Sequence, residues 1–289
     1  MLKLDFMKKL WVLYVGMMMT VAGMAQQLSV ATFNIRLDVA SDSPNHWKNR
    51  KEKVVSQVLF HQWDVLGVQE ALPNQVADLK ALLPTYGFTG VGREDGDNKG
   101  EFSGIFYKKE KLELLASETF WLSLTPTVPG SKSWDAAITR IVTWAKFKHK
   151  KSGKIFYHFN THFDHIGQEA RRQSAHMLLQ KVNSIAGNTA AIITGDFNAQ
   201  PKDEPIRIIV DETNPLHLTD AKALSKNGHY GPVGTFNGFG PKEKDEAPID
   251  YIFMKGKWQV LQHATISQTW GGRFASDHFA VMAVVMLGK

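Results

Sequence analysis

The chain has 289 residues, 43% of them apolar, a formal net charge of +6 at pH 7 and no cysteine. This length and apolar content can bury a large core, and the absence of cysteine excludes a small disulfide-stapled scaffold. The mild positive charge permits an anionic substrate but does not indicate a surface that wraps DNA. No Pro-rich or Gly/Ser-rich linker interrupts the chain, so we expect a single domain over residues 26–289.

The first 25 residues have the pattern of a secretory signal peptide. Lys8 and Lys9 precede an apolar stretch at 10–22, and the small residues Gly23 and Ala25 stand at the two positions that determine cleavage. The stretch is too short for a comfortable membrane span. We therefore expect an exported protein, periplasmic or extracellular, with cleavage near Ala25. An uncleaved membrane anchor is the alternative.

The mature chain alternates short apolar strands with amphipathic helices. In chain order, the sequence predicts a strand at 28–33, a helix at about 47–62, a strand at 65–68, a short helix from Pro73, and strands at 103–107, 112–115, 141–147 and 155–159. A helix with its apolar face at 175–185 follows, then a buried strand at 190–193, a short helix from Pro205, and strands at 249–254, 260–266 and 279–287. The second half thus repeats the plan of the first, as a large two-sheet α/β fold allows.

A long connection at 117–138 is rich in Trp, Thr, Ser and Pro, which is typical of a binding loop. Trp121 and Trp134 stand out in it, although each is equally consistent with a partly buried surface residue. Arg140 begins the next strand, where it can reach an anion or form an ordinary salt bridge.

Polar side chains stand at the ends of several predicted strands. Glu70 follows an apolar strand directly, where a carboxylate is costly unless it is paired, and where a metal ligand would lie. Asp196 and Asn198 are two residues apart, so in extended backbone they point to the same face. A carboxylate can take a proton or hold a metal, and a carboxamide can donate to a phosphate oxygen. An Asx turn that caps the strand is the alternative for this pair.

The last of these features is a predicted Asp–His pair. Asp250 lies inside the apolar run 249–253, where it needs a partner. His278, in the segment Ser276-Asp277-His278 before the last strand, offers one. Such a pair fixes the tautomer of the imidazole and raises its basicity.

Six segments together resemble the endonuclease/exonuclease/phosphatase superfamily, which contains DNase I and exonuclease III. They are Thr32-Phe33-Asn34-Ile35-Arg36, Val68-Gln69-Glu70, Asn160-Thr161-His162, Gly195-Asp196-Phe197-Asn198, Ile249-Asp250-Tyr251-Ile252 and Ser276-Asp277-His278. They occur in the family's order and span nearly the whole mature chain. Further segments at 120–123, 129–132 and 234–239 are similar to a secreted bacterial branch of unassigned substrate.

The resemblance implies a four-layer α/β/β/α sandwich and a phosphoesterase that hydrolyses a phosphodiester or a phosphomonoester. It assigns Mg²⁺ or Mn²⁺ to Glu70, helped by Asn34 and Asp277, because hard cations prefer oxygen ligands. It further implies that Asp196 activates the attacking water, that Asn198 and His162 donate to the phosphoryl oxygens, and that His278, held by Asp250, stabilises the developing charge.

The substrate site is expected to be a walled pocket. The loops 117–138 and 234–239 would bring Trp134 and Phe236 over the strand ends, with Arg36 nearby and Arg140 meeting a second or terminal phosphate. We therefore expect as substrate a phosphorylated small molecule or a single-stranded nucleic acid. Nothing in the sequence indicates an obligate protein partner, so we expect a monomer.

Two other functions compete with this one. Asn160-x-His162-x-Asp164-His165 is one residue away from the zinc signature of metallo-β-lactamase-type hydrolases, but Asn160 replaces the first histidine and a carboxamide is a poor zinc ligand. A non-catalytic binding module on the same fold is the other alternative. It is disfavoured because every acid and histidine that the chemistry needs is present.

Overall fold

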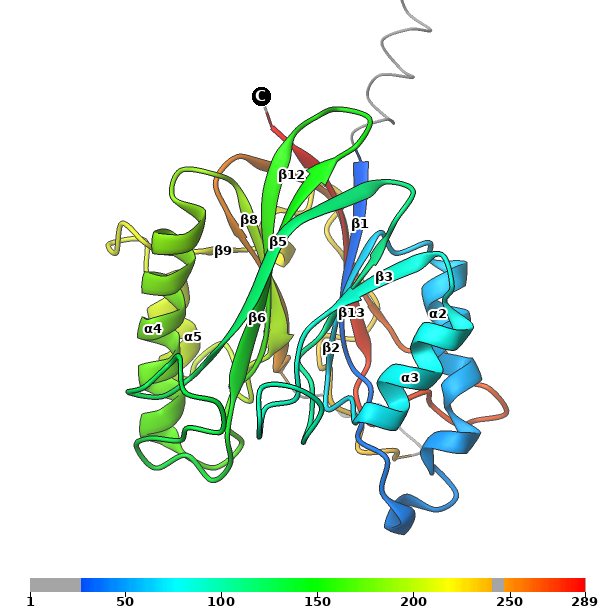
Figure 1. The fold of residues 1–289 in the computed structure, drawn as a ribbon. Coiled ribbons are helices and arrows are strands. Elements are labelled where there is room, and N and C mark those ends of the chain that lie inside the picture. The colour runs from blue at the N-terminus through cyan, green and yellow to red at the C-terminus, as the bar shows by residue number, and fades with distance from the viewer. Residues whose placement is uncertain (1–26, 241–246, 289) are drawn as a thin grey trace, which may run out of the picture.

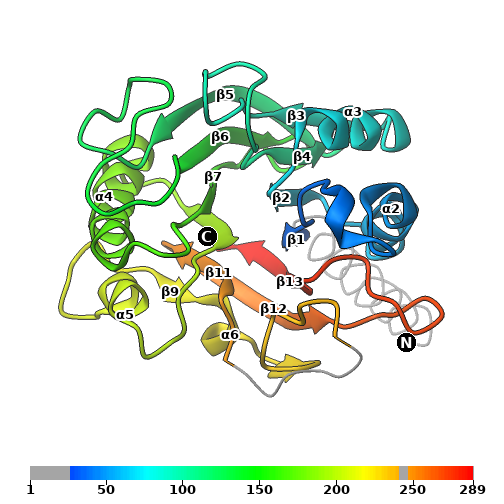
Figure 2. The ribbon, with the colours of Figure 1, turned by 90° about the horizontal axis from the view of Figure 1, so that it is seen from below.

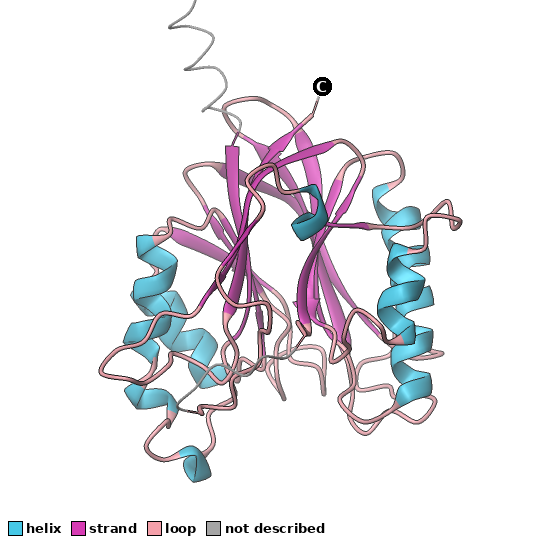
Figure 3. Cartoon of the chain, turned by 180° about the vertical axis from the view of Figure 1, so that it is seen from behind, coloured by secondary structure: helices cyan, strands magenta, loops and turns pink. Residues whose placement is uncertain are grey.

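The fold is that of a computed structural model, which describes residues 27–240 and 247–288. The predicted signal peptide, residues 1–25, lies outside these residues. Two β-sheets stand face to face, with helices on the outer side of each (Figures 1 and 3). Seen from below, α2 and α3 cover one sheet and α4 and α5 cover the other (Figure 2). The predicted four-layer α/β/β/α sandwich is therefore confirmed.

The first sheet has seven strands in the order β10-β12-β13-β1-β2-β4-β3. Its strands are β1 Gln27–Asn34, β2 Val65–Gln69, β3 Tyr86–Thr89, β4 Ile105–Lys108, β10 His229–Tyr230, β12 Trp258–Ile266 and β13 Ala280–Leu287. The sheet is mixed, because β1 runs parallel to β2 and antiparallel to β13.

The second sheet has six strands in the order β5-β6-β7-β8-β11-β9. They are β5 Leu112–Trp121, β6 Ile141–His149, β7 Ile155–His162, β8 Ala191–Asp196, β9 Thr219–Asp220 and β11 Asp250–Lys255. Only β7 and β8 run parallel in this sheet. Every residue of β8 is buried, as expected for a strand covered on both faces.

The helices lie where their apolar faces can cover a sheet. They are η1 Ala40–Asp42, η2 Trp47–Asn49, α2 Lys51–Phe60, α3 Pro73–Leu82, α4 Gln168–Ala186, α5 Glu204–Val210 and α6 Ala221–Leu224. Pro73 suits the first turn of α3 because its fixed φ is already helical and its missing N–H would have no partner there. Within the described ranges, no helix is long and apolar enough to cross a membrane.

A buried amide joins the two sheets behind the strand ends. Asn160 of β7 is fully buried, and its Nδ2 donates to the carbonyls of Val68 and Gly104, both at 2.9 Å. Its Oδ1 accepts from Gln69 Nε2 at 2.7 Å. A Cβ at Gly67 would lie 2.3 Å from this Oδ1, so only glycine fits there. The amide fixes the spacing of the sheets at the seam where the polar strand ends meet.

The predicted strands and helices are present, with differences at their ends. The long connection predicted at 117–138 is wrong in its first part, because β5 continues through Trp121. β7 likewise continues through His162 instead of ending at 159. The helix predicted at 47–62 is divided into η2 and α2. The short strands β3, β9 and β10 were not predicted, since two to four residues carry too little periodicity.

Candidate active site

A pocket of about 400 Å³ opens at the seam between the two sheets. It lies where β1, β2, β7 and β8 end, at the lower end of the molecule in Figure 1. The residues that line it are Arg36, Leu37, Glu70, Glu101, Ile138, Arg140, His162, His165, Asp196, Asn198, Phe236, Ile249, Asp277 and His278. The structure thus brings together most of the predicted site residues, although they span 243 positions of the sequence from Arg36 to His278 (inclusive of both ends).

The first sheet contributes two carboxylates to the pocket. Glu70 follows β2 in a left-handed conformation with φ 61°, and Asp277 precedes β13. Arg36 lies between them, with its Nη1 3.9 Å from Glu70 Oε2 and its Nε 3.7 Å from Asp277 Oδ2. Burial raises the pKa of Asp277, and the negative charge of Glu70 adds to the effect, although His278 and Arg36 oppose it. Both carboxylates thus lie within 4 Å of the same guanidinium, and that they hold a metal stays a prediction.

Arg36 is held firmly by a third carboxylate. Its Nε donates to Asp42 Oδ2 at 2.8 Å and its Nη2 to Asp42 Oδ1 at 3.1 Å. The hydrogen bonds to Asp42 hold the pKa of Arg36 above its ordinary value, although burial opposes them. The predicted substrate-binding residue therefore lies in the pocket, but its guanidinium is already paired with acids of this chain.

That Asn34 helps to hold the metal stays a prediction, and in this structure its side-chain oxygen is already engaged. Its Oδ1 accepts the backbone N–H of Arg36 at 3.0 Å, which fixes the orientation of the amide. Its Nδ2 therefore faces the site and donates to Glu70 Oε1 at 2.9 Å and to Asp196 Oδ2 at 3.0 Å. Asn34 is fully buried and positions the two carboxylates, one from each sheet.

The predicted Asp–His pair is present. Nδ1 of His278 lies 2.9 Å from Asp250 Oδ2, and its Nε2 lies 3.7 Å from Asp196 Oδ2. Asp250 comes from the first residue of β11 and lies behind His278, away from the pocket. Asp196, Asp250 and His278 also offer ligand atoms within 4.8 Å of one another. The ring of His278 thus forms a hydrogen bond with Asp250 on one side and an ion pair with Asp196 on the other, while Asp250 Oδ1 is buried without a hydrogen-bond partner.

Burial and mutual charge set the protonation of this row. Burial raises the pKa of Asp196 to about 7, and the negative charge of Asp250 adds to the effect. Burial would lower the pKa of His278, but Asp250 and Asp196 outweigh it and hold that pKa well above the ordinary value. His278 is therefore a cation flanked by carboxylates, and Asp196 is poised to exchange a proton near neutral pH.

His162 and Asn198 reach the pocket with their polar atoms partly engaged. Asn198 Nδ2 donates to the Phe163 carbonyl at 3.0 Å and lies 3.0 Å from His162 Nε2. His162 Nε2 is also 3.4 Å from Asp196 Oδ2. Burial, with the charge of Arg140, holds the pKa of His162 well below its ordinary value, so the ring is neutral. That either residue donates to a phosphoryl oxygen stays a prediction.

Arg140, directly before β6, adds a buried cation to the lining of this pocket. Only 5% of the residue is exposed, yet its Nε and Nη1 have no hydrogen-bond partner. Nη2 lies 3.2 Å from His165 Nδ1, and Nε is 3.8 Å from Asp164 Oδ2. Asp164 is itself engaged by the backbone N–H groups of Ile166 and Gly167. A buried guanidinium with unmatched N–H groups is costly, and that Arg140 meets an anion stays a prediction.

Of the predicted aromatic walls, only Phe236 lines the pocket. Its ring stands edge-on to His278, with centroids 5.0 Å apart. Trp134 lies outside the lining, in a left-handed conformation with φ 55°, and Ile138 takes the wall position instead. Trp121 is buried and donates to the Arg93 carbonyl at 2.7 Å. The proposed stacking surface of several aromatic rings is therefore not formed.

Several pocket residues were not predicted. Glu101 lines one wall and pairs with Arg93 at 2.6 Å, and burial raises its pKa. His165, which the sequence offered only as part of the zinc-like pattern, approaches Arg140. The zinc site itself does not form among the described residues, because the amide of Asn160 is used between the sheets and Asp164 accepts backbone N–H groups.

The donor set fits a hard divalent cation. Glu70 and Asp277 offer carboxylate oxygens toward one point of the pocket, where Arg36 now supplies positive charge. No thiol occurs in the chain, and the histidine ring nitrogens nearest this point face other carboxylates. Oxygen ligands suit Mg²⁺ or Mn²⁺ better than softer metals.

Known proteins match nearly the whole chain. The model of the Endonuclease/Exonuclease/phosphatase family matches residues 31–278. A solved endonuclease/exonuclease/phosphatase from Bacteroides vulgatus is 41% identical with a TM-score of 0.87, and the match covers 91% of this chain and 99% of that one. A mannosyl-6-phosphatase of Bacteroides thetaiotaomicron is 37% identical with a TM-score of 0.85, covering 90% of this chain and 100% of that one.

More distant relatives are longer proteins. Nocturnin of Drosophila melanogaster is 26% identical over 190 residues, which cover 61% of this chain but only 28% of that protein. The matched family segment contains every strand end that builds the pocket, from Asn34 to His278. The sequence match and the shared architecture agree with the geometry of the site, and the chain belongs to the endonuclease/exonuclease/phosphatase family.

Proposed function

We propose that this protein is a divalent-metal-dependent phosphoesterase whose substrate is a compact phosphorylated molecule, and that the substrate is a phosphomonoester of a sugar. The observation that carries the proposal is the buried guanidinium of Arg140. Its Nε and Nη1 are buried without hydrogen-bond partners, and the residue lines the same pocket as Asp196 and His278. A phosphate in this pocket would supply the missing acceptors while it lies beside a base and a cation.

The shape of the pocket favours a sugar over a nucleobase or a duplex. A volume of about 400 Å³ fits a small ligand, and ten of the fourteen lining residues have polar or charged side chains. Stacking of successive bases needs several aromatic faces, and Phe236 is the one aromatic ring in the lining. The mannosyl-6-phosphatase whose match covers 90% of this chain supports the same choice.

The chain's own residues divide the chemistry between them. Asp196 would orient a water molecule and take its proton, and Asn34 holds this carboxylate in place. His278, charged and backed by Asp250, would donate to the phosphoryl oxygens as their charge grows. Arg140 would fix the orientation of the phosphate. Glu70 and Asp277 would hold the cation, which when bound polarises the phosphoryl group and helps to neutralise the leaving oxygen.

The place of action is a second part of the proposal. Residues 1–25 carry the pattern of a signal peptide, so we propose that the protein acts after export and after cleavage near Ala25. Mass spectrometry of the secreted protein would then find its N-terminus at or within two residues of Gln26. A full-length form in the membrane fraction would contradict this part alone.

A substrate panel with added Mg²⁺ tests the proposed function. It compares mannose 6-phosphate, glucose 6-phosphate, a nucleoside 5′-monophosphate, a single-stranded oligonucleotide and closed-circular duplex DNA. We expect release of inorganic phosphate to be fastest from a hexose 6-phosphate. Efficient cutting of either nucleic acid without phosphate release from the sugars would contradict the proposal.

A further inference from the structure

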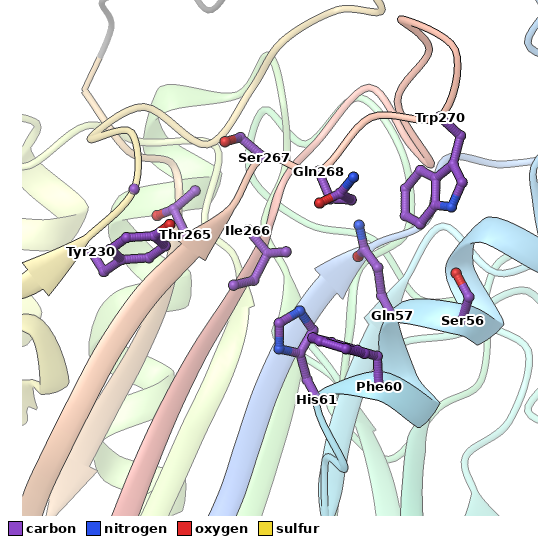
Figure 4. Close-up of a pocket in the computed structure, with 11 residues that line it drawn as sticks. Ser56, Gln57, Phe60, His61, Tyr230, Thr265, Ile266, Ser267, Gln268 and Trp270 are labelled. Atoms are coloured by element: carbon purple, nitrogen blue, oxygen red, sulfur yellow. The ribbon is translucent and has the colours of Figure 1, made fainter.

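A second pocket, larger than the first, lies beside helix α2 on the first sheet and is not used by the proposed chemistry. Its volume is about 550 Å³, within the range of small-molecule binding sites. Figure 4 shows its walls. The residues that line it are Ser56, Gln57, Phe60, His61, Tyr230, Gly231, Thr265, Ile266, Ser267, Gln268 and Trp270. None of them lines the catalytic pocket.

Aromatic rings are exposed at this pocket. Phe60 is 82% exposed and Tyr230 is 77% exposed, which is unusual for side chains of this size. Trp270 is only partly covered, and it stands opposite Tyr230 across the pocket (Figure 4). Two separated aromatic faces can hold a flat apolar surface of a ligand while its edge remains in water.

The floor between the aromatic rings carries an unsatisfied amide. Gln57 is 4% exposed, and its Oε1 is buried without a hydrogen-bond partner. In Figure 4 its side chain points from α2 into the pocket, toward Gln268. An unpaired buried acceptor destabilises the fold, so its presence at the floor of a pocket indicates a ligand that donates to it.

The lining is otherwise neutral and rich in hydrogen-bonding groups. It contains hydroxyls from Ser56, Thr265 and Ser267 and no acid, lysine or arginine. Burial lowers the pKa of His61, so its ring is uncharged at neutral pH. A charged ligand would find no counter-ion here. The lining therefore suits a neutral ligand that has several hydroxyl groups and at least one flat C–H face.

We propose that this pocket is a binding site for a neutral carbohydrate, in which a sugar ring packs against Trp270 or Tyr230 and one of its hydroxyl groups donates to Gln57 Oε1. The site binds sugar without cleaving it. It does not depend on the proposed phosphoesterase activity, since it shares no residue with the catalytic pocket.

Saturation-transfer NMR on the purified protein tests the proposal, with methyl α-mannoside, α-1,2-mannobiose and methyl β-glucoside as unlabelled probes. We expect transfer to the ring protons of at least one sugar. Trp270→Ala and Tyr230→Ala should weaken binding about tenfold or more. Gln57→Leu keeps the volume of the side chain but removes the unpaired acceptor, so it should weaken binding while the melting temperature stays the same or rises. Leu124→Ala, which truncates another exposed apolar residue (73% exposed), is the matched control and should bind as wild type.

Phosphate release from a hexose 6-phosphate should be unchanged in Trp270→Ala and Tyr230→Ala, which separates this site from the catalytic one. The proposal is overturned if no sugar shows transfer at millimolar concentration. It is equally overturned if transfer persists undiminished in both aromatic variants. Reversible self-association that Trp270→Ala abolishes would also overturn it, because the pocket would then serve a protein contact.

Discussion

The two sheets bring different charged groups to the catalytic pocket, beside the row that Asp196, His278 and Asp250 form between them. The side built by the first sheet offers Glu70 and Asp277, and its Arg36 is fully paired with acids. The side built by the second sheet offers Arg140, whose N–H groups are partly unmatched. One side is therefore suited to a cation and the other to an anion. A phosphate ester with its metal needs both, so the seam between the sheets is where the chemistry becomes possible.

Two contacts tie these sides together. Asn34 of the first sheet donates to Asp196 of the second at 3.0 Å, and His278 before β13 lies 2.9 Å from Asp250 of β11. In each contact one residue fixes the orientation of the other: Asn34 orients the Asp196 carboxylate, and Asp250 orients the His278 ring. The comparison predicts that substitutions on the two sides will change different kinetic parameters, and that substitutions at the seam will change turnover itself.

The largest effect is expected at the base. Asp196→Asn removes the proton acceptor but keeps the shape and the hydrogen bond from the Asn198 backbone. We expect kcat for phosphate release to fall by at least about 10²–10⁴-fold, with the melting temperature retained. Asp211→Asn, an exposed aspartate outside the pocket, serves as the control. Near-normal turnover in Asp196→Asn would show that another group activates the water.

The next effect concerns the pair across the seam. Asp250 lies outside the pocket lining, so Asp250→Asn should lower kcat by about 10²-fold and leave KM nearly unchanged. His278→Ala should be comparably severe. Because the two act as a unit, the double variant should be no worse than the more damaging single one. Additive losses in that cycle would contradict the assignment of the pair.

A smaller effect should separate the predicted aromatic residues. Phe236 lines the pocket beside His278, whereas Trp134 does not line it. Phe236→Ala should raise KM for a hexose 6-phosphate by about threefold to tenfold, the loss of one apolar contact. Trp134→Ala should leave KM unchanged. An equal rise in both variants would restore the aromatic wall that the sequence predicted.

The last effect is on stability instead of turnover and concerns the buried interior of the second sheet. Burial lowers the pKa of His158 to about 3, while the unfolded chain protonates this histidine near 6.5. Between these values the unfolded state binds the extra proton, so stability is complete above pH 6.5 and falls as the pH decreases toward 3. The slope is about 1.4 kcal/mol per pH unit. In urea titrations, the free energy of unfolding of His158→Gln should depend less on pH than that of the wild type. An identical pH dependence would contradict the assignment of this effect to His158.

The fold and most of the site follow from short-range patterns in the sequence. Glu70, Asp196 and Asp250 each stand in or next to an apolar run, where an acid is costly unless it has a partner, so their pairing is predictable. The resemblance to a known family supplied the layer order. The pairing of these acids is therefore predictable from neighbouring residues in the chain, whereas the layer order came from the family resemblance.

What the sequence did not predict depends on contacts between the sheets. The orientation of the Asn34 amide is set by the backbone of Arg36 and by two carboxylates from other strands. Trp134 is no less conspicuous in the sequence than Phe236, yet only the path of its loop removes it from the pocket. Such outcomes depend on long-range geometry, which no periodicity or composition encodes.

A metal titration of turnover tests the division between the two sides most directly. Phosphate release from a hexose 6-phosphate is measured against Mg²⁺ and against substrate for the wild type, Glu70→Gln and Arg140→Gln. We predict no activity in EDTA, a half-saturating Mg²⁺ concentration about 10–100-fold higher in Glu70→Gln, and a KM at least about tenfold higher in Arg140→Gln with unchanged Mg²⁺ dependence. Full activity in EDTA, or the same parameter changed by both substitutions, would contradict the account.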